Sequence, residues 1–154
     1  MAAGCARSAP AAPPPSAASP LLAASAPDFR RTALDGSAVD VARLRGRVVV
    51  LDFFAEHCAP CARALPALEA FHRASPEVAI VGVSEDDDPD GAARMVMRHG
   101  LTFQVIHDAD HVLAGRFRVT ELPASFVVDP RGVVRWCGTT ESADQMGAVV
   151  FASR

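Results

Sequence analysis

The chain has 154 residues, a length that fits one domain and is short for two. Half of its residues are hydrophobic, 21% are charged, and the formal net charge is −3. This composition supports a sizeable core, and with no basic stripe in the sequence it argues against nucleic-acid binding. No stretch approaches the roughly 18 apolar residues of a membrane-spanning helix.

The N-terminal segment differs from the rest in composition. Twenty-one of residues 1–27 are Ala, Pro or Ser. Such a stretch has too little apolar bulk to offset its ordering entropy, so we expect a disordered tether over 1–27 and a folded domain over 28–154.

Residues 2–5, Ala-Ala-Gly-Cys, are similar to the end of a bacterial lipoprotein signal, in which Cys5 would carry a lipid. Only Met1 precedes them, so an ordinary Ala-rich N-terminus is the alternative. Lipidation of Cys5 would give a membrane-anchored protein outside the cytoplasm, in the periplasm or its equivalent. A chain that starts as given would be cytoplasmic.

The domain begins with a hairpin and a strand. Asp35-Gly36 lies between short apolar stretches and predicts a hairpin turn, and residues 41–46 predict a brief helical turn. Residues 48–54 are a continuous β-branched and aromatic run, which indicates a strand buried on both faces.

Helices and strands then alternate. Pro66 should kink the first helix, and Thr140 or Ser142 is the candidate cap of the last. The order predicts an α/β domain with a mixed sheet that closes in a hairpin. The predicted elements are helix 62–74, strand 78–83, helix 91–99, strand 103–106, helix 110–117, strands 127–128 and 133–134 around a turn at 129–132, and helix 142–151.

Cys58 and Cys61 form a C-x-x-C pair directly after the buried strand. Haem attachment would need His at position 62, which is Ala, and structural zinc would need a second close pair of ligands. Thiol–disulfide chemistry fits better, because the N–H groups and partial positive charge of a helix N-terminus favour a thiolate on Cys58. Pro60 stiffens the turn between the two sulfurs.

Three segments together resemble the TlpA/ResA type of thiol–disulfide oxidoreductase, which has the thioredoxin-like fold with helices on both faces of a central mixed sheet. Residues 26–61 (APDFRRTALDGSAVDVARLRGRVVVLDFFAEHCAPC) are similar to the opening hairpin, core strand and active-site turn. Residues 78–108 (VAIVGVSEDDDPDGAARMVMRHGLTFQVIHD) resemble the strand–helix–strand insertion of this branch, and residues 116–134 (RFRVTELPASFVVDPRGVV) resemble the segment with the cis-proline.

The resemblance implies a role for each matching residue. Cys58 would attack, Cys61 would resolve, and Pro123 would be the cis-proline that packs against the disulfide and offers backbone to an extended substrate. Asp52 would be the buried acid that exchanges a proton with the resolving thiol, with a raised pKa. The neighbouring residues His57, Pro60 and Leu122 are the expected substrate contacts.

The chain departs from the family pattern at three positions. His57 replaces the Trp that thioredoxins and many relatives carry before the first Cys; an imidazolium there would favour the Cys58 thiolate, and a neutral, solvent-facing ring is the alternative. Ala64 replaces an acid found in many ResA-like proteins, so Asp52 would work alone or with Glu56. Ala124 follows Pro123, where Thr is usual.

We therefore expect a monomeric reductant of protein disulfides that needs no cofactor or metal and takes electrons from a dithiol protein. A thiol peroxidase is one alternative, but its pattern places Thr where this chain has Ala55. A copper-binding module is another, although copper chaperones of this fold separate the cysteines by three residues. Cys137, beside Trp136, is expected to be a small buried thiol, with a third redox cysteine as the alternative.

The remaining polar groups favour ordinary surface roles. Asp86, Asp88 and Asp90 copy the start of a calcium loop, but its twelfth position would be Met97, so we expect a solvated loop that caps a helix. His107 and His111, with their neighbouring acids, are expected to be surface residues rather than metal ligands.

Overall fold

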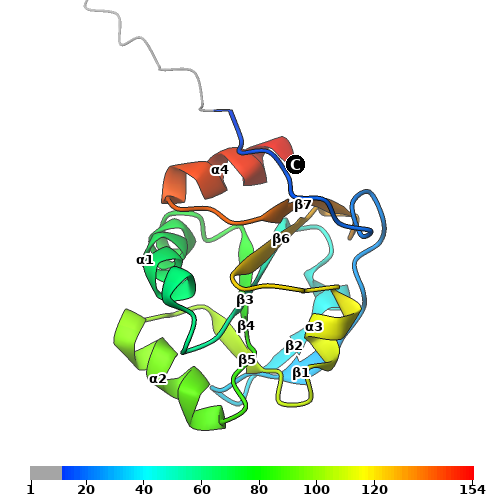
Figure 1. Cartoon of the computed structure of the whole chain (residues 1–154). Coiled ribbons are helices and arrows are strands. Elements are labelled where there is room, and N and C mark those ends of the chain that lie inside the picture. The colour runs from blue at the N-terminus through cyan, green and yellow to red at the C-terminus, as the bar shows by residue number, and fades with distance from the viewer. Residues whose placement is uncertain (1–11) are drawn as a thin grey trace, which may run out of the picture.

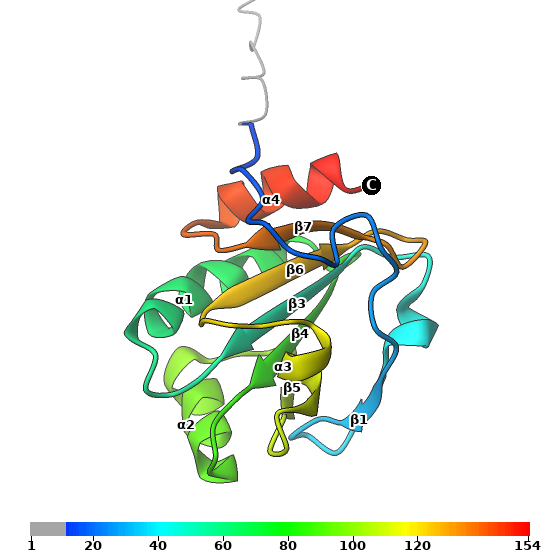
Figure 2. The same cartoon turned by 45° about the vertical axis from the view of Figure 1, so that its right-hand side comes forward.

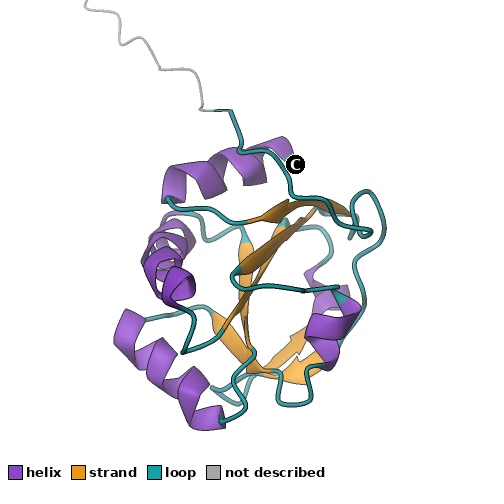
Figure 3. Cartoon of the chain, in the orientation of Figure 1, coloured by secondary structure: helices purple, strands orange, loops and turns teal. Residues whose placement is uncertain are grey.

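The structure, a computed structural model, describes residues 12–154. Its centre is a five-stranded sheet in the order β5-β4-β3-β6-β7 (Figures 1 and 3). β3 pairs in parallel with β4 and antiparallel with β6, so the sheet is mixed, as predicted. The strands are β3 (Val49–Phe54), β4 (Ala79–Ser84), β5 (Gln104–His107), β6 (Ala124–Val128) and β7 (Val134–Gly138).

Helices cover both faces of this sheet, which confirms the predicted architecture. Three helices pack on one face: α1 (Ala59–Ala74), α2 (Pro89–His99) and α4 (Ala143–Ala152). The other face carries α3 (Val112–Arg116), the hairpin of β1 (Arg30–Thr32) and β2 (Ala38–Asp40), and the 3-10 helix η1 (Val41–Leu44). Figure 2 shows the two layers on either side of the twisted strands.

β3 organises the core because all six of its side chains are buried. Successive side chains of a strand point to opposite faces. Val50 and Phe54 therefore join the core cluster beneath α1 and α4, whereas Leu51 and Phe53 join the cluster beneath α3 and the hairpin. The same alternation turns Asp52 toward the α1 and α4 side.

The element boundaries differ from the predicted ones in ways that have physical reasons. α1 begins at Ala59 rather than at residue 62, since a proline such as Pro60 is tolerated in the first turn. The helix continues through Pro66 to Ala74. β6 and β7 are each five residues long, because pairing of β6 with β3 and of β7 with β6 recruits residues of modest strand propensity. Ser142, not Thr140, caps α4 by accepting the N–H of Gln145 at 3.2 Å.

Residues 14–26, which we call the strap, lie along the outer edge of β7 (Figure 1). Backbone N–H groups of Ala17, Ala23 and Ala26 donate to carbonyls of β7 and of the turn before it, at 2.8–2.9 Å. The expectation of a free tether is therefore wrong for this part of the chain, because the unpaired groups of an edge strand bind it. Residues 1–11, including Cys5, lie outside the described residues.

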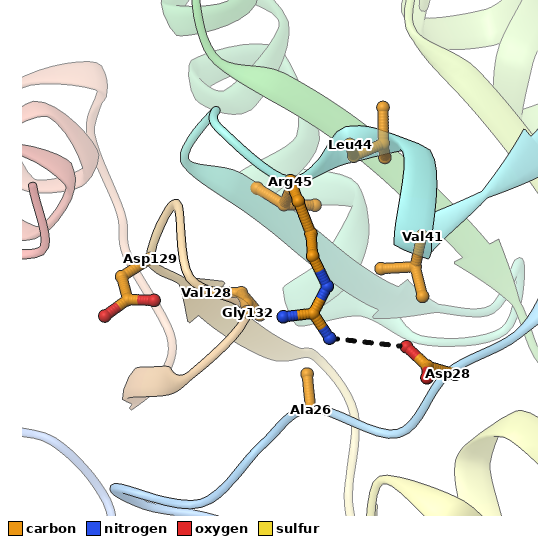
Figure 4. Close-up of a pocket in the computed structure, with 9 residues that line it drawn as sticks. Ala26, Asp28, Val41, Leu44, Arg45, Val128, Asp129 and Gly132 are labelled. Carbon is orange, nitrogen blue, oxygen red and sulfur yellow. Dashed lines mark ion pairs between the residues drawn. The ribbon is translucent and has the colours of Figure 1, made fainter.

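The end of the sheet remote from the cysteines is closed by Arg45 (Figure 4). Its guanidinium pairs with Asp28 at 3.8 Å and lies over Gly132 in the β6–β7 turn. A cavity there is lined by Val49 and Val128, at the start of β3 and the end of β6. None of the predicted site residues reaches it. Within residues 12–154, no helix combines the length and apolarity that crossing a membrane requires.

Candidate active site

Cys58 and Cys61 form a disulfide at the start of α1, with their Cα atoms 5.2 Å apart. Cys58 is the N-cap residue of the helix, and its Sγ accepts the N–H of Cys61 at 3.2 Å. Cys58 is 8% exposed and Cys61 is 1% exposed, so the first sulfur is the more accessible one. After reduction, the same N–H group and the helix N-terminus would favour a thiolate on Cys58.

The turn before Cys58 is anchored to the neighbouring loop by Asp86. Oδ1 of Asp86 accepts the N–H of Glu56 at 2.9 Å, and Oδ2 accepts the hydroxyl of Ser84 at 2.8 Å. The carboxylate of Glu56 pairs with Arg94 at 2.7 Å and with Arg98 at 3.3 Å. These pairs, the hydrogen bond from Arg94 above all, hold the pKa of Glu56 below its usual range. Glu56 is thus a link between the turn and α2.

Asp52 lies in the middle of β3 and is 6% exposed. The hydroxyl of Ser125, opposite it on β6, donates to Oδ1 at 2.6 Å. Loss of solvation raises the pKa of Asp52 to about 7, and the hydrogen bond from Ser125 opposes part of that rise. A carboxyl with this pKa can take up or release a proton near neutrality.

A small cavity of about 10 Å³ adjoins Asp52 and is also lined by Ala64, Pro123 and Thr140. Such a volume is about the size that holds one water molecule. Ala64, at the position where many ResA-like proteins carry an acid, lines this cavity with a small side chain and leaves it unfilled.

A groove of about 320 Å³ reaches Pro60, which lies between the two cysteines in the sequence. Pro60 and Pro123 line it, together with Arg63, Thr139 and Glu141. The peptide bond between Leu122 and Pro123 is cis. Pro123 and Ala64 line both this groove and the cavity at Asp52, so the groove and the buried acid are neighbours.

The structure thus brings most of the predicted site residues together. His57 is exposed beside Cys58, and Leu122 is half-buried between the two core clusters. Ser125 and the groove residues 139–141 belong to the site but were not predicted from the sequence. The one sequence feature that pointed to Ser125 is a polar residue within an apolar stretch. Its contact with Asp52 follows from the register of β3 against β6.

The other polar groups have structural partners. Asp88 caps α2 by accepting the N–H of Asp90 at 3.0 Å. His111 contacts Glu85 at 2.8 Å and Asp87 at 3.2 Å. In the described part of the chain, no group of three or more His, Cys, Asp or Glu side chains is placed to hold a metal ion. Cys137 is buried, with its Sγ 3.1 Å from the carbonyl oxygen of Ala17.

Comparisons with known proteins agree with this geometry. The AhpC/TSA family model matches residues 22–137. Thiol-disulfide oxidoreductase ResA of Bacillus thuringiensis (strain Al Hakam) is 31% identical over 111 residues, which cover 71% of this chain and 64% of that protein. The chain thus spans a little under two thirds of the length of this relative.

Two solved structures are similar to this chain over most of its length. A secreted Mycobacterium tuberculosis disulfide oxidoreductase homologous to E. coli DsbE is 29% identical, with a TM-score of 0.74 over 80% of this chain and 95% of the other. MTB dsbF, in its mixed oxidized and reduced forms, is 30% identical, with a TM-score of 0.75 over 82% and 95%. The chain therefore belongs to the AhpC/TSA family and has the thioredoxin-like fold of these oxidoreductases.

Proposed function

We propose that the protein is a thiol–disulfide oxidoreductase that reduces disulfides of other proteins. The observation that carries the proposal is the Cys58–Cys61 disulfide, which lies at a helix N-terminus beside the groove that Pro60 and Pro123 line. Relatives named as disulfide oxidoreductases support the same chemistry.

The first step is attack on the substrate. In the reduced protein the Cys58 thiolate attacks one sulfur of a substrate disulfide, and the substrate bond breaks as a bond from Cys58 to that sulfur forms. The other substrate sulfur leaves as a thiolate and takes a proton. In the disulfide form the N–H of Cys61 lies 3.2 Å from Sγ of Cys58. The same N–H group would donate a hydrogen bond that stabilises the attacking thiolate.

The second step releases the product. Cys61 passes its proton toward Asp52 and attacks Sγ of Cys58, which forms the Cys58–Cys61 disulfide and frees the second substrate thiolate. The substrate has gained two electrons and the protein has lost two. A dithiol protein, the electron donor, would return the pair to the reduced state. The raised pKa of Asp52 suits a group that accepts this proton near neutral pH.

Substrate binding would use backbone next to the cis-proline. Within residues 12–154, the N–H groups of Thr120, Glu121 and Leu122 donate no hydrogen bond. Unpaired backbone groups of this kind can hydrogen-bond to an extended peptide, which then lies beside this segment as an added strand. His57 and Pro60 would contact the other side of the substrate cysteine.

The proposal also covers the cellular location and the oligomeric state of the protein. The M. tuberculosis relative is a secreted protein. We infer an extracytoplasmic site for this chain, anchored through a lipid on Cys5 if the full-length precursor carries a signal. The protein would act as a monomer, without a cofactor or metal of its own, and apart from this lipid it would have no membrane contact and no nucleic-acid partner.

The decisive experiment is insulin reduction with dithiothreitol as the electron donor. We expect the wild type to accelerate insulin reduction above the rate with dithiothreitol alone, and Cys58→Ser to give no acceleration. Hydrogen peroxide is the matched second substrate, because the AhpC/TSA match keeps a thiol peroxidase as the rival function. Peroxide consumption that depends on Cys58, with insulin left intact, would favour that rival. Stoichiometric retention of Cu(I) against a chelator, with neither activity, would favour the copper-binding module.

A further inference from the structure

A second groove, of about 510 Å³, lies on the other side of the cis-proline. One wall is the strap at residues 14–20, and the other is the loop at residues 118–121 that leads to the cis bond. Ala124, Phe126 and Cys137 line it from β6 and β7. Its volume lies in the range of natural ligand pockets, roughly 300–1,000 Å³. We call it the strap groove.

Three hydrogen bonds hold the strap wall against β7. Nε1 of Trp136 donates to the carbonyl oxygen of Pro14 at 2.9 Å. The N–H of Cys137 donates to Oγ of Ser16 at 3.0 Å, and the N–H of Ala17 donates to the carbonyl oxygen of Cys137 at 2.8 Å. A wall fixed at three successive points keeps its shape when a ligand enters, which lowers the ordering cost of binding.

The strap groove is continuous with the groove at the cysteines. Pro123 and Thr139 line both of them. A chain that lies across Pro123 with its cysteine near Cys58 would therefore enter the strap groove with the residues on one side of that cysteine. The exposed backbone of Thr120 and Glu121 borders the path, and its N–H groups donate no hydrogen bond within the described residues.

We propose that the strap groove binds the segment that flanks the cysteine of the disulfide substrate, as an extended and uncharged stretch of a few residues. This inference rests on the proposed function and adds a substrate preference to it. Nine of its 17 lining residues are Pro, Ala, Val or Phe and four are Ser or Thr, and its two charged side chains, Arg118 and Glu121, are of opposite sign. An uncharged segment fits this lining, because a charged one would lose solvation without a matched partner.

The test compares small disulfides that differ only in their flanks. The minimal probe is the disulfide dimer of N-acetylcysteine amide. Two longer probes add Thr-Ala-Val-Ala either before or after the cysteine, and matched probes add Asp-Ala-Glu-Ala. We expect one of the two uncharged flanks to raise kcat/KM at least about tenfold over the minimal probe, the effect of a single good contact region, and the charged flank to lose most of that gain.

Three variants locate the effect. Ala18→Trp and Thr120→Trp place a large side chain in opposite walls of the strap groove, and each should reduce the ratio of kcat/KM between long and minimal probes to near one. Ala12→Trp changes an exposed residue of the same N-terminal stretch that does not line the groove, and should keep the wild-type ratio. Two independent walls guard against misfolding of one variant, and the ratio is insensitive to the amount of active protein.

Some outcomes overturn the proposal. If neither flank raises kcat/KM of the wild type, or if both wall variants keep the wild-type gain, the strap groove does not bind the substrate. A gain that is equal for charged and uncharged flanks would overturn the proposed preference. Failure of the wild type to reduce even the minimal probe is a different result, because it contradicts the proposed function itself.

Discussion

The hydroxyl of Ser125 donates a 2.6 Å hydrogen bond to Oδ1 of Asp52, across the antiparallel pair of β6 and β3. Ser125 follows the cis-proline by two residues, so one short segment both lines the substrate groove and contacts the buried acid. Burial alone would raise the pKa of Asp52 further; the hydrogen bond favours the ionised form and holds the pKa near 7.

Replacement of Asp52 by Asn should stabilise the oxidised protein at pH 8. The folded pKa of Asp52 is raised from 3.8 to about 7, so the folded state binds more protons than the unfolded state between these values, and wild-type stability falls as pH rises through that window. At about 1.4 kcal/mol per pKa unit, the gain at pH 8 is at most roughly 4 kcal/mol, and it should vanish near pH 4.

Denaturant unfolding of both proteins at pH 4 and pH 8 measures this difference. An equal gap at the two pH values would show that the substitution acts through packing rather than through ionisation. The same variant should slow the release of substrate by Cys61, because the proton acceptor is lost, while attack by Cys58 is affected less.

Ser125→Ala should raise the pKa of Asp52 above its wild-type value. The substitution removes the hydrogen bond that favours the carboxylate, and leaves the burial that opposes it. The pKa is measurable from the carboxyl carbon resonance of Asp52, and the pH profile of the resolving step should move in the same direction. Ser125→Thr, which keeps the hydroxyl, is the control. A lowered or unchanged pKa in Ser125→Ala would rule out this role for the hydroxyl.

Gly91→Ala should destabilise the protein, and Gly115→Ala should not. A Cβ on Gly91 would lie 2.9 Å from Cγ of Asp86, the side chain that anchors the turn before Cys58. The clash should cost about 1–3 kcal/mol, typical of overpacking. A Cβ on Gly115 meets no atom of the described residues within 4 Å, so alanine there should stabilise α3 by up to about 1 kcal/mol. Thermal unfolding of the two variants checks both signs.

Local sequence patterns predicted much of the fold. The six apolar or aromatic neighbours around Asp52 identified β3 correctly, and Asp35-Gly36 identified the hairpin of β1 and β2. The spacing of Cys58 and Cys61 was sufficient to identify the C-x-x-C pair. The fold as a whole was identified by resemblance, since several modest matches occurred in the right order.

Features that depend on pairing between distant segments were not predictable. The contact between Ser125 and Asp52 requires the register of β6 against β3, which no local pattern encodes. The composition of the strap predicts a disordered tether, whereas its order comes from hydrogen bonds to the open edge of β7. The role of Asp86 as an anchor was also hidden, because the acidic loop suggested only solvation or calcium.

The most direct test of the central claim is capture of the mixed disulfide by Cys61→Ser. Reduced Cys61→Ser and reduced Cys58→Ser are each mixed with a small excess of oxidised insulin. The products of each reaction are separated under non-reducing conditions, and their masses are measured by mass spectrometry. We expect Cys61→Ser to accumulate one covalent adduct per chain through Cys58, which dithiothreitol releases, and Cys58→Ser to accumulate none. Equal adduct on both variants, or adduct formed through Cys137 instead, would contradict the assignment of Cys58 as the attacking thiol.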